Sequence, residues 1–242
     1  MAKKGGGRHL KRYGASRAVI LPRKSFVWTT KPEPGPHTTV SSIPLRLVIR
    51  DYLSIAHNAR EADRAIYAGA VSVDGIIRRS PGFAVGLMDV VQISSLGRVY
   101  RVLLDHRGRL VLFETDPSEA SVKLCKVVRK QNVKNKKIQL TLHDAKNFMG
   151  DLLEYKPGDV VKISFPEQKM IERLPFEVGS LAMVTGGRNV SRVGRISEIK
   201  LISGTQSNIV TLNDDSETFQ APEHYVFVLG KEKSAIDLPV RK

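Results

Sequence analysis

The sequence of 242 residues contains a single cysteine, Cys125. One thiol cannot form an internal disulfide, and it cannot build the multi-cysteine cages that hold zinc or iron–sulfur clusters. Cys125 lies in a strand-like run with Leu124 and Val127, so we expect a packed thiol there and not a nucleophile. The histidines show no spacing typical of a metal site, and the sequence predicts neither a metal nor a cofactor.

Long hydrophobic runs are also missing. No run approaches the ~20 apolar residues that a membrane-spanning helix requires. Near the N-terminus the longest run extends from Ala18 to Leu21, which is shorter than the ~7–15 residues of a secretory signal. Gly5, Gly6 and Gly7 disfavour the amphipathic helix of a mitochondrial presequence. The expectation is a cytosolic chain without a membrane-spanning segment.

Acidic residues are absent from the N-terminal segment, because none precedes Glu33. Over the whole chain 39 Lys and Arg outnumber 24 Asp and Glu, which gives a formal net charge of +15. Such an excess favours a polyanionic partner: RNA, DNA or an anionic membrane surface. Residues 1–42 are expected to form a basic arm with too little apolar surface to order itself in solution, so that it becomes ordered only against phosphates. The candidate contacts in this arm are Lys3, Lys4, Arg8, Lys11, Arg12, Arg17, Arg23 and Lys24, together with Trp28 for stacking on a base.

Two helices are predicted after this arm. Leu45, Ile49 and Leu53 recur at helical spacing, behind Ser42 and Pro44 as start signals. The second helix is expected from Asn58, a good N-cap with Glu61 at the capping-box position, to Ala68, where Gly69 ends it.

The rest of the chain has the pattern of short strands separated by turns. Val71 and Val73 begin a strand, Asp74-Gly75 indicates a tight hairpin, and a further strand fits Asp89 to Ile93. His106 to Leu110 is interpreted as another hairpin turn. From about Glu177 to Leu229 the alternation of strands and glycines is typical of a small barrel. The residues assigned to structural turns are Gly69, Asp74, Gly75, Gly186, Gly187 and Gly194.

The predicted helices carry arginines at one-turn spacing. Arg46 and Arg50 form one stripe, and Arg60 and Arg64 form the other. Such stripes can bridge the phosphates of an RNA backbone. The alternative is an ordinary solvated face, partly neutralised by neighbouring acids.

Leu45 to Ile93 resembles the alpha-L RNA-binding module of small-subunit ribosomal proteins, some pseudouridine synthases and tyrosyl-tRNA synthetases. The matching residues are Ala59-Arg60-Glu61-Ala62, Ile66, Gly69, Val71-Ser72-Val73-Asp74-Gly75 and the strand from Asp89. Asp74 stands where the module usually has Asn. The resemblance implies RNA contact through Arg46, Arg50, Arg60, Arg64, Arg78 and Arg79.

Val178 to Gly204 resembles a KOW motif, on the residues Val184-Thr185-Gly186-Gly187-Arg188-Asn189 and Gly194-Arg195-Ile196. Glycines allow a loop to turn sharply and bring backbone N–H groups close to an anion. Arg188, Arg192 and Arg195 make this loop basic and are candidate RNA contacts.

Another acid-free stretch consists of Lys123, Lys126, Arg129, Lys130, Lys134, Lys136 and Lys137. On a hairpin these residues either protect a sheet edge from aggregation or contact phosphate. We favour contact, chiefly through Lys134, Lys136 and Lys137.

The order of these parts resembles the archaeal and eukaryotic ribosomal protein family S4e, over essentially the whole chain and with a length of archaeal type. Further matching stretches are Lys4-Gly5-Gly6, His9-Leu10-Lys11-Arg12, Leu124-Cys125-Lys126-Val127, Leu142-His143-Asp144 and Pro157-Gly158-Asp159-Val160. The resemblance implies a structural constituent of the small ribosomal subunit in the cytoplasm, with ribosomal RNA and neighbouring ribosomal proteins as partners, no membrane partner and no small-molecule substrate. The fold class is α+β and β-rich, divided into residues 1–42 (basic arm), 43–96 (alpha-L module), 97–174 (central β-rich domain) and 175–242 (SH3-like KOW barrel and tail).

Two other functions fit the sequence less well. A pseudouridine synthase needs Gly-Arg-Leu-Asp, but Gly108-Arg109-Leu110 is followed by Val111, so the nucleophilic carboxylate is missing and no enzyme is predicted. A KOW-containing transcription factor is disfavoured by the basic arm and the alpha-L module. His143 beside Asp144 is interpreted as a turn and not as a catalytic relay, since adjacent strand residues point to opposite faces.

Overall fold

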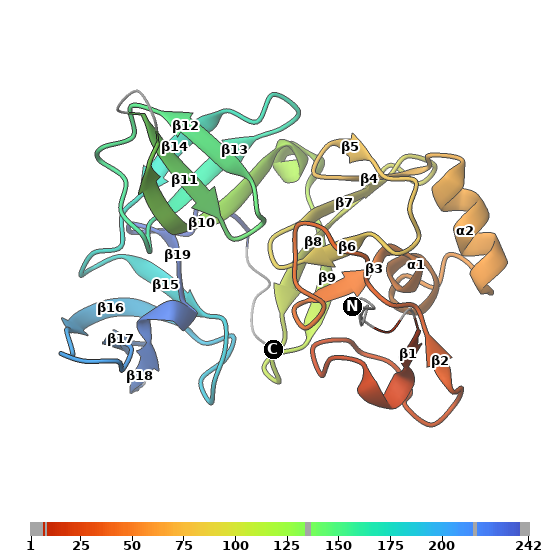
Figure 1. Ribbon diagram of the computed structural model, residues 1–242, viewed down its shortest axis with the longest axis horizontal. Coiled ribbons are helices and arrows are strands. Elements are labelled where there is room, and N and C mark those ends of the chain that lie inside the picture. The colour runs from red at the N-terminus through yellow and green to blue at the C-terminus, as the bar shows by residue number, and fades with distance from the viewer. Residues whose placement is uncertain (1–6, 8, 134–136, 215–216, 238–242) are drawn as a thin grey trace, which may run out of the picture.

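The computed structural model describes residues 7, 9–133, 137–214 and 217–237. Its sheets are antiparallel, and three of them have five strands each. Figure 1 shows the helices and the first five-stranded sheet on the right, the central sheet at the upper left and the C-terminal sheet at the lower left. The β-rich α+β class expected from the sequence is confirmed. Within the described residues, no helix is both long and apolar enough to cross a membrane.

The N-terminal segment folds onto the body of the protein. Strand β1 (Leu10–Lys11) pairs with β2 (Trp28–Thr29), and the short helix η1 (Arg12–Gly14) follows β1. Ala15, Val19 and Leu21 are buried in the same core as the helices. This corrects the expectation that the segment has too little apolar surface to order itself, because these three side chains complete a core built by later residues.

The first predicted helix is present over residues 45–52. It consists of α1 (Leu45–Leu47) and the π-helical turn η2 (Val48–Tyr52). Leu45 and Ile49 are buried. The apolar spacing therefore identified the face that packs inward.

Helix α2 (Ala59–Tyr67) has the predicted boundaries to within a residue. The Asn58 side chain accepts a hydrogen bond from the Glu61 amide at 2.9 Å, and the Glu61 carboxylate accepts one from the His57 amide. Gly69 follows in the left-handed region with φ +81°. These local signals explain why the helix begins and ends where it does.

The first large sheet has the strand order β5-β4-β7-β8-β9. The hairpin expected at Asp74 and Gly75 joins β4 to β5, with both residues at positive φ. The turn at Gly108 joins β8 to β9, as predicted. The boundary proposed between residues 96 and 97 falls between β7 and β8 and thus divides this sheet. Its strands are β4 (Val71–Val73), β5 (Ile76–Ile77), β7 (Val90–Ile93), β8 (Arg98–Leu104) and β9 (Leu110–Thr115).

A small second sheet attaches the start of the helical pair to this unit. In it β3 (Ser42–Pro44) pairs with β6 (Ala84–Gly86). Ile43 and Val85, which are opposite one another, are fully buried. The pairing holds Pro44 and the first turn of α1 against the large sheet.

The central sheet has the order β12-β11-β10-β13-β14. A short 3₁₀ helix, η3 (Pro117–Ser121), leads into it. Cys125 and Leu140 are fully buried in the apolar core that packs on this sheet, so the expected packed thiol is confirmed. The strands are β10 (Val122–Asn132), β11 (Ile138–Leu142), β12 (Asn147–Gly150), β13 (Val160–Ser164) and β14 (Met170–Leu174).

The C-terminal sheet has the order β18-β17-β16-β15-β19, and the 3₁₀ helix η4 (Glu223–Tyr225) lies between β18 and β19. This order, in which the first strand lies between the second and the last, matches the expected SH3-like barrel. Gly194 lies inside β16 and not in a turn, which corrects that prediction; a Cβ there would come within 2.8 Å of the Asn213 carbonyl oxygen. The strands are β15 (Leu181–Val184), β16 (Val193–Lys200), β17 (Ile209–Asn213), β18 (Thr218–Pro222) and β19 (Val226–Gly230).

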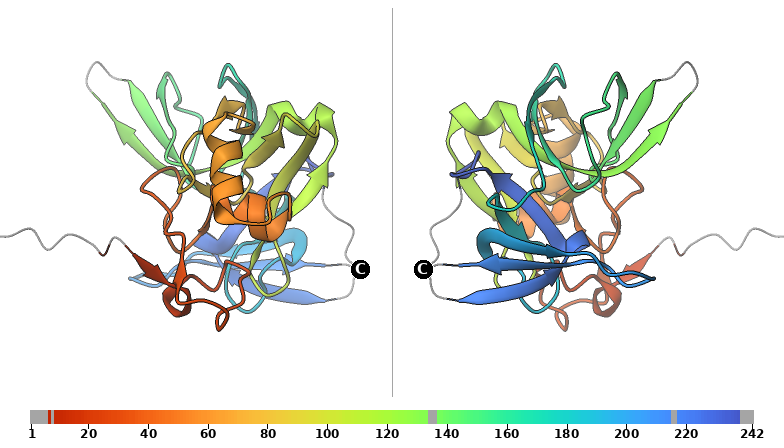
Figure 2. Two further views of the ribbon diagram at one scale, coloured as in Figure 1. Left: turned by 90° about the vertical axis from the view of Figure 1, so that its right-hand side faces the viewer. Right: turned by 90° about the vertical axis from the view of Figure 1, so that its left-hand side faces the viewer.

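One apolar cluster joins the three large sheets. Met88 and Leu103 from the first unit meet Leu124 of β10 and Phe227 of β19. The views in Figure 2 show the central sheet above and the C-terminal sheet below, with the N-terminal hairpin at the lower edge. The three large sheets are therefore held together by the hydrophobic contacts of this cluster.

Candidate nucleic-acid interface

Helix α2 presents two arginines to the solvent. Ala62 and Ile66 are both 0% exposed and determine which side of the helix faces the core. Arg60 and Arg64, one turn apart, lie on the opposite side and are exposed. Within the described residues neither makes an ion pair. Their guanidinium groups are therefore uncompensated positive charges on a rigid helix.

The other predicted stripe is largely neutralised. Arg46 donates two hydrogen bonds to Asp63, at 2.6 and 2.8 Å, and thereby ties α1 to α2. Arg50 makes a similar forked contact with Asp51, at 2.7 and 2.8 Å. That hydrogen bond raises the pKa of Arg50 further above its ordinary value. Both side chains are only partly exposed, so this stripe offers less free charge than Arg60 and Arg64.

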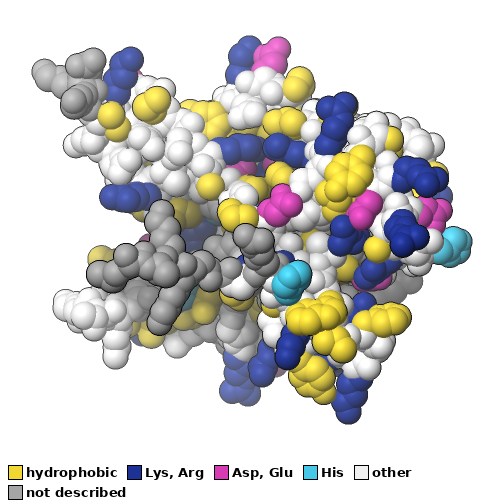
Figure 3. Space-filling model, turned by 45° about the vertical axis from the view of Figure 1, so that its right-hand side comes forward, with side chains coloured by type: hydrophobic (Ala, Val, Ile, Leu, Met, Phe, Trp, Pro, Cys, Tyr) yellow, Lys and Arg dark blue, Asp and Glu magenta, His cyan; other side chains and the backbone are white. Residues whose placement is uncertain are grey.

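The two arginines after the hairpin behave differently from one another. Arg78 is half-buried with its guanidinium 4.5 Å from the centre of the Phe83 ring. Arg79 is exposed and lies beside Gly69, where a side chain would come within 3.6 Å of its Nη2. Arg79 thus extends the free charge of Arg60 and Arg64 beyond the end of α2. We call these three residues the α2 surface; Figure 3 shows Lys and Arg side chains spread over this right-hand part of the molecule.

The candidate contacts of the N-terminal arm fall into two groups. Lys11, Arg17 and Lys24 are exposed. Arg12, in contrast, is 5% exposed, and its guanidinium donates to the carbonyl of Pro22 at 2.8 Å and to Ser25 Oγ at 2.7 Å. The expected phosphate contact at Arg12 is corrected accordingly, because that group completes the fold of the arm. Lys3, Lys4 and Arg8 lie outside the described residues.

Arg23 is also engaged inside the arm. Its guanidinium donates to the carbonyl of Ala15 at 2.6 Å and to that of Ser16 at 2.8 Å. Arg23 is half-buried, so it holds the loop together and leaves little of its charge for a ligand.

The C-terminal loop keeps part of its predicted charge. Arg188 is exposed, and the turn before it contains Gly187 at φ +83°. Arg195 is exposed and donates to the Glu232 carbonyl at 3.0 Å. Arg192 is half-buried, 3.1 Å from Glu217 and 4.3 Å from the centre of the Phe219 ring. Arg188 is thus the least engaged of the three.

The acid-free stretch of the central sheet is divided between surface and interior. Lys137 is exposed, whereas Lys134 and Lys136 lie outside the described residues. Lys123 is 0% exposed. Lys126 points inward, and its Nζ donates to the carbonyls of Glu223, His224 and Val226 at 3.2, 3.1 and 2.6 Å. The phosphate contacts expected at Lys123 and Lys126 are therefore corrected.

Lys123 occupies the centre of a buried charge cluster. Its Nζ lies 2.7 Å from Asp74, 2.5 Å from Asp89 and 3.1 Å from Asp144. Asp74 and Asp89 belong to the first unit, whereas Lys123 and Asp144 belong to the central sheet. Lys146 joins from the edge, at 3.3 Å from Asp74 and 3.2 Å from Asp144. The cluster therefore connects the two units through charge.

The buried cluster keeps its groups ionised. Burial alone would raise the pKa of Asp89, but Lys123 and His37 hold that pKa well below the ordinary range. For Asp144 burial is likewise opposed by Lys123 and Lys146, and the pKa is lowered. Burial would lower the pKa of Lys123, yet Asp89 and Asp74 raise it well above its ordinary value. Each charge is thus stabilised by its opposite partners.

Cys125, His143 and Asp144 place ligand atoms within 4.8 Å of one another. The donor set fits a metal poorly, because the Lys123 ammonium already holds Asp144 at 3.1 Å. Burial raises the pKa of the Cys125 thiol well above its ordinary value, which disfavours the thiolate that a metal needs. Burial lowers the pKa of His143 to about 4. The positive charge of Lys123 takes the place that a cation would occupy.

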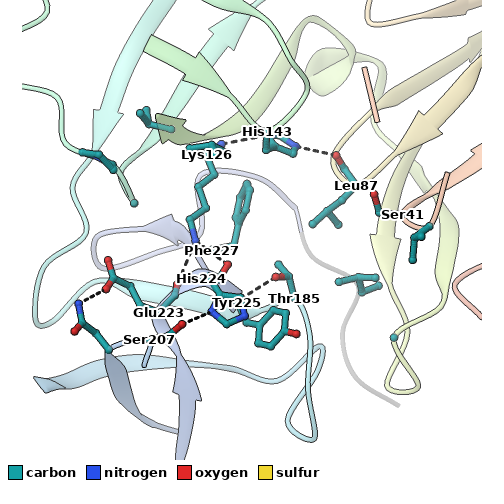
Figure 4. Close-up of a pocket in the computed structure, with 18 of the residues that line it drawn as sticks. Ser41, Leu87, Lys126, His143, Thr185, Ser207, Glu223, His224, Tyr225 and Phe227 are labelled. Carbon is teal, nitrogen blue, oxygen red and sulfur yellow. Dashed lines mark hydrogen bonds between the residues drawn. The ribbon is translucent and has the colours of Figure 1, made fainter. Parts of the chain in front are cut away.

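A cleft of about 900 Å³ opens where the N-terminal segment, the central sheet and the C-terminal sheet meet. Figure 4 shows Lys126 reaching across it towards the carbonyls around η4, and His143 turned towards Leu87. His143 Nε2 lies 3.2 Å from the Leu87 carbonyl oxygen. Burial lowers the pKa of Lys126 to about 8. Both side chains therefore connect parts of the fold across the cleft.

The charge cluster was not predicted from the sequence. Asp74 was assigned to a turn and His143-Asp144 to another turn, and both assignments are confirmed by the backbone. Their further role depends on Lys123, which is 49 residues from Asp74 and 21 from Asp144. One signal was available in the sequence of β10. Lys123 stands at a position that alternates with Cys125 and Val127, and the apolar character of those two residues indicates that this face of the strand is buried.

Comparisons with known proteins agree with this arrangement. A family model described as Ribosomal family S4e matches residues 96–170, one described as RS4NT (NUC023) domain matches residues 4–39, and one described as S4 domain matches residues 49–91. The S4 match covers most of the helical pair and the β4–β5 hairpin, which contain the α2 surface.

Similar proteins match nearly the whole length. Small ribosomal subunit protein eS4 of Methanothermobacter thermautotrophicus is 45% identical over 240 residues, 99% of both chains. The protein of that name in Methanocaldococcus jannaschii is 44% identical over 247 aligned positions, covering 98% of this chain and all of the other. A crystal structure of 30S ribosomal protein S4e from Thermoplasma acidophilum superposes with a TM-score of 0.71 at 37% identity, over 79% of this chain and 96% of that one.

Proposed function

The chain belongs to the S4e family of small-subunit ribosomal proteins, and on that premise we propose that it binds ribosomal RNA as a structural constituent of the small subunit. Its partners are then ribosomal RNA and neighbouring ribosomal proteins, and its place is the ribosome in the cytoplasm. The relatives named above carry the small-subunit designation in their names. The strong positive charge of the chain supports the same partner class.

The observation that carries the proposal is the α2 surface. Arg60, Arg64 and Arg79 are exposed, lie on or beside one rigid helix, and make no ion pair within the described residues. A guanidinium can give two parallel hydrogen bonds to a phosphate, which favours arginine at such a surface. Because α2 is fixed by a cap at its start and by buried Ala62 and Ile66, the arginines are positioned before RNA arrives.

Further basic patches act together with the α2 surface. Each patch alone binds weakly, but linkage on one chain raises the combined affinity, since binding of one patch concentrates the others near their RNA segments. Phosphate contacts supply most of the energy, and RNA shape supplies most of the selectivity. The exposed residues proposed for these contacts are Lys11, Arg17, Lys24, Lys137, Arg188 and Arg195, with smaller contributions from the engaged Arg23, Arg46, Arg50, Arg78 and Arg192. Lys3, Lys4, Arg8, Lys134 and Lys136 remain predictions from the sequence.

We propose no enzymatic activity. Val111 stands where a pseudouridine synthase requires its carboxylate, and it lies half-buried in β9 opposite Leu103. His143 and Asp144 are engaged with Leu87 and Lys123, respectively. These engagements support a structural role for the polar groups around the cleft.

Co-sedimentation tests the proposal. The purified chain is added to small subunits stripped of their proteins by salt, to large-subunit ribosomal RNA, and to nuclease-treated small-subunit RNA. We expect saturable binding to small-subunit RNA that persists in moderate salt and disappears after nuclease treatment. Equal binding to the large-subunit RNA, or binding that survives nuclease, would contradict the proposed function.

A further inference from the structure

The N-terminal segment exposes large aromatic side chains beside positive charge. Tyr13 is 70% exposed, Phe26 is 72% exposed and Trp28 is 56% exposed. Leaving such side chains in water forgoes the free energy that burial would provide. Figure 3 shows hydrophobic side chains gathered at the lower right, over this segment, with Lys and Arg at their edge. No acidic residue precedes Glu33 in the sequence.

The aromatic side chains stand on an ordered scaffold. Arg12 donates from inside the loop to Pro22, Ser25 and Trp28, the last at 3.3 Å to the carbonyl oxygen. Arg23 bonds the opposite side of the loop, through the carbonyls of Ala15 and Ser16. The chain therefore uses two of its arginines to hold the loop. Ordering before binding reduces the entropy that a ligand would otherwise have to offset.

The register of the hairpin determines which residues face outward. Lys11 is opposite Trp28, and both are exposed, whereas Leu10 and Thr29 are turned inward. Beyond this pair, Tyr13 and Phe26 line a groove of about 370 Å³ together with Lys11 and Lys24. Lys11 is therefore next to Trp28 and also lines the groove with Tyr13, Phe26 and Lys24, so aromatic rings and ammonium groups are neighbours on the exposed surface of this segment.

We propose that this face, the arm platform (Lys11, Tyr13, Lys24, Phe26 and Trp28), binds unpaired RNA. Bases stack on the exposed rings, and the two lysines hold the intervening phosphates. The inference rests on the proposed function, because it takes RNA as the partner, and it adds the structural class of RNA that this site accepts. Within a duplex the faces of the bases are already stacked, so only an open loop, bulge or strand end can offer them to an aromatic ring.

Charge distinguishes this ligand from a protein partner. An apolar protein surface would require the rings but not the lysines. A nucleotide combines a π face with a phosphate, which matches a ring next to an ammonium. The α2 surface has the complementary character, since it offers guanidinium groups without exposed rings other than Tyr67 at its end.

The single tryptophan gives a direct readout, because Trp28 is the only one in the chain. Its fluorescence is followed while the full-length protein is titrated with three RNAs: an unstructured eight-nucleotide strand, an abasic strand with the same phosphates, and a duplex of equal length. We expect quenching by the unstructured strand and little change with the other two. Equal quenching by the abasic strand would overturn the proposal, because bases would then be irrelevant.

Substitutions then assign the contacts. Trp28→Leu and Phe26→Leu keep an apolar side chain but remove the π face, and we expect each to weaken binding of the unstructured strand about 5- to 150-fold, the factor that corresponds to ~1–3 kcal/mol of stacking per base. Val27→Ala is the matched control, because Val27 lies between Phe26 and Trp28 in the sequence and is 63% exposed, but has no ring. Anisotropy of labelled RNA measures all three, and unchanged unfolding midpoints establish that the variants fold.

The failure of this inference is separable from the failure of the proposed function. If the variants bind the unstructured strand as the parent does, the platform is wrong even where small-subunit RNA still binds through the α2 surface. If the variants bind RNA normally but no longer enter reconstituted subunits, the rings contact a ribosomal protein and the proposal is overturned. If no RNA binds in any assay, the proposed function itself fails.

Discussion

Two regions of the molecule use cationic side chains in opposite ways. In the buried cluster, Lys123 is 0% exposed and lies within 3.1 Å of carboxylates from Asp74, Asp89 and Asp144. On the α2 surface, Arg60 and Arg64 are exposed and make no ion pair within the described residues. The same formal charge therefore connects the protein's own units in one region and faces solvent in the other, where we propose that it meets RNA.

The difference follows from solvation. A buried ammonium must be compensated completely, since removal from water costs several kcal/mol per ion. An exposed guanidinium keeps its water until a phosphate replaces it, so it can remain uncompensated. The net charge of +15 therefore includes cations such as Lys123 that are buried and compensated inside the protein, as well as exposed ones such as Arg60 that are free to meet a ligand.

The largest expected effect comes from removing the central buried cation. Lys123→Met leaves the surrounding carboxylates buried without their partner, and we expect the free energy of unfolding to fall by ~3–5 kcal/mol. Denaturant unfolding followed by circular dichroism measures it. Lys137→Met is the matched control, because Lys137 is exposed in the same domain, and its effect should stay within ~0.5 kcal/mol. If the two variants lost the same free energy of unfolding, buried and exposed cations would not differ in their contribution to stability, which would contradict this account.

Acid tests the buried cluster without a mutation. The folded pKa of His143 is about 4, below its ordinary 6.5, so the unfolded chain takes up this proton first as pH falls between these values. The folded pKa values of Asp89 and Asp144 are also lowered; the stability they contribute is present above about pH 4 and is lost below it. We expect the melting temperature to decline from about pH 6.5 and more steeply below pH 4. A flat profile down to pH 3 would contradict this account.

An intermediate effect is expected at Arg46, whose forked contact with Asp63 is partly exposed. Arg46→Ala should lower the free energy of unfolding by about 1 kcal/mol, because solvent screens such a pair but its geometry is good. A double-mutant cycle with Asp63→Ala isolates the pair. A coupling energy near zero would show that Asp63 does not hold Arg46, whose charge would then be as free as that of Arg60 and Arg64.

The smallest effect on stability is expected on the α2 surface. Arg60→Ala with Arg64→Ala should change the free energy of unfolding by less than ~0.5 kcal/mol per site, since neither side chain has an ion-pair partner within the described residues and alanine favours the helix. Thermal unfolding provides the measurement. If the free energy of unfolding fell as much as in Arg46→Ala, Arg60 or Arg64 would make stabilising contacts within the protein, and the description of both as free charges would be wrong.

The sequence predicted the parts of the fold that depend on neighbouring residues. Asn58 and Glu61 determine the start of α2, Gly69 its end, and Asp74-Gly75 the β4–β5 turn, because each signal acts within a few residues. The buried cluster was beyond such reasoning. Lys123 lies 49 and 34 residues from Asp74 and Asp89 in the sequence. The apolar alternation of β10 hints that Lys123 is buried, but nothing local shows which carboxylates it meets.

The N-terminal segment shows the same limit. Ala15, Val19 and Leu21 lack strong periodicity, and the sequence predicted disorder from composition. They are buried because they pack against apolar residues of the helical pair, which are distant in the sequence. For the candidate site, composition and helical spacing pointed to Arg60 and Arg64, whose contact with RNA stays a prediction. They could not separate these residues from Arg12 and Lys123, whose positive charge is used inside the protein.

The most direct measurement is the salt dependence of binding to small-subunit ribosomal RNA. The parent chain is compared with the Arg60→Ala, Arg64→Ala double variant and, as a matched control, with Arg46→Ala. We expect the slope of log affinity against log salt to become shallower by roughly 0.7–0.9 for each phosphate that the double variant no longer binds. The change in Arg46→Ala should be smaller than that of the double variant, because Asp63 already neutralises most of the Arg46 charge. An unchanged slope in the double variant would contradict the assignment of exposed arginines to RNA.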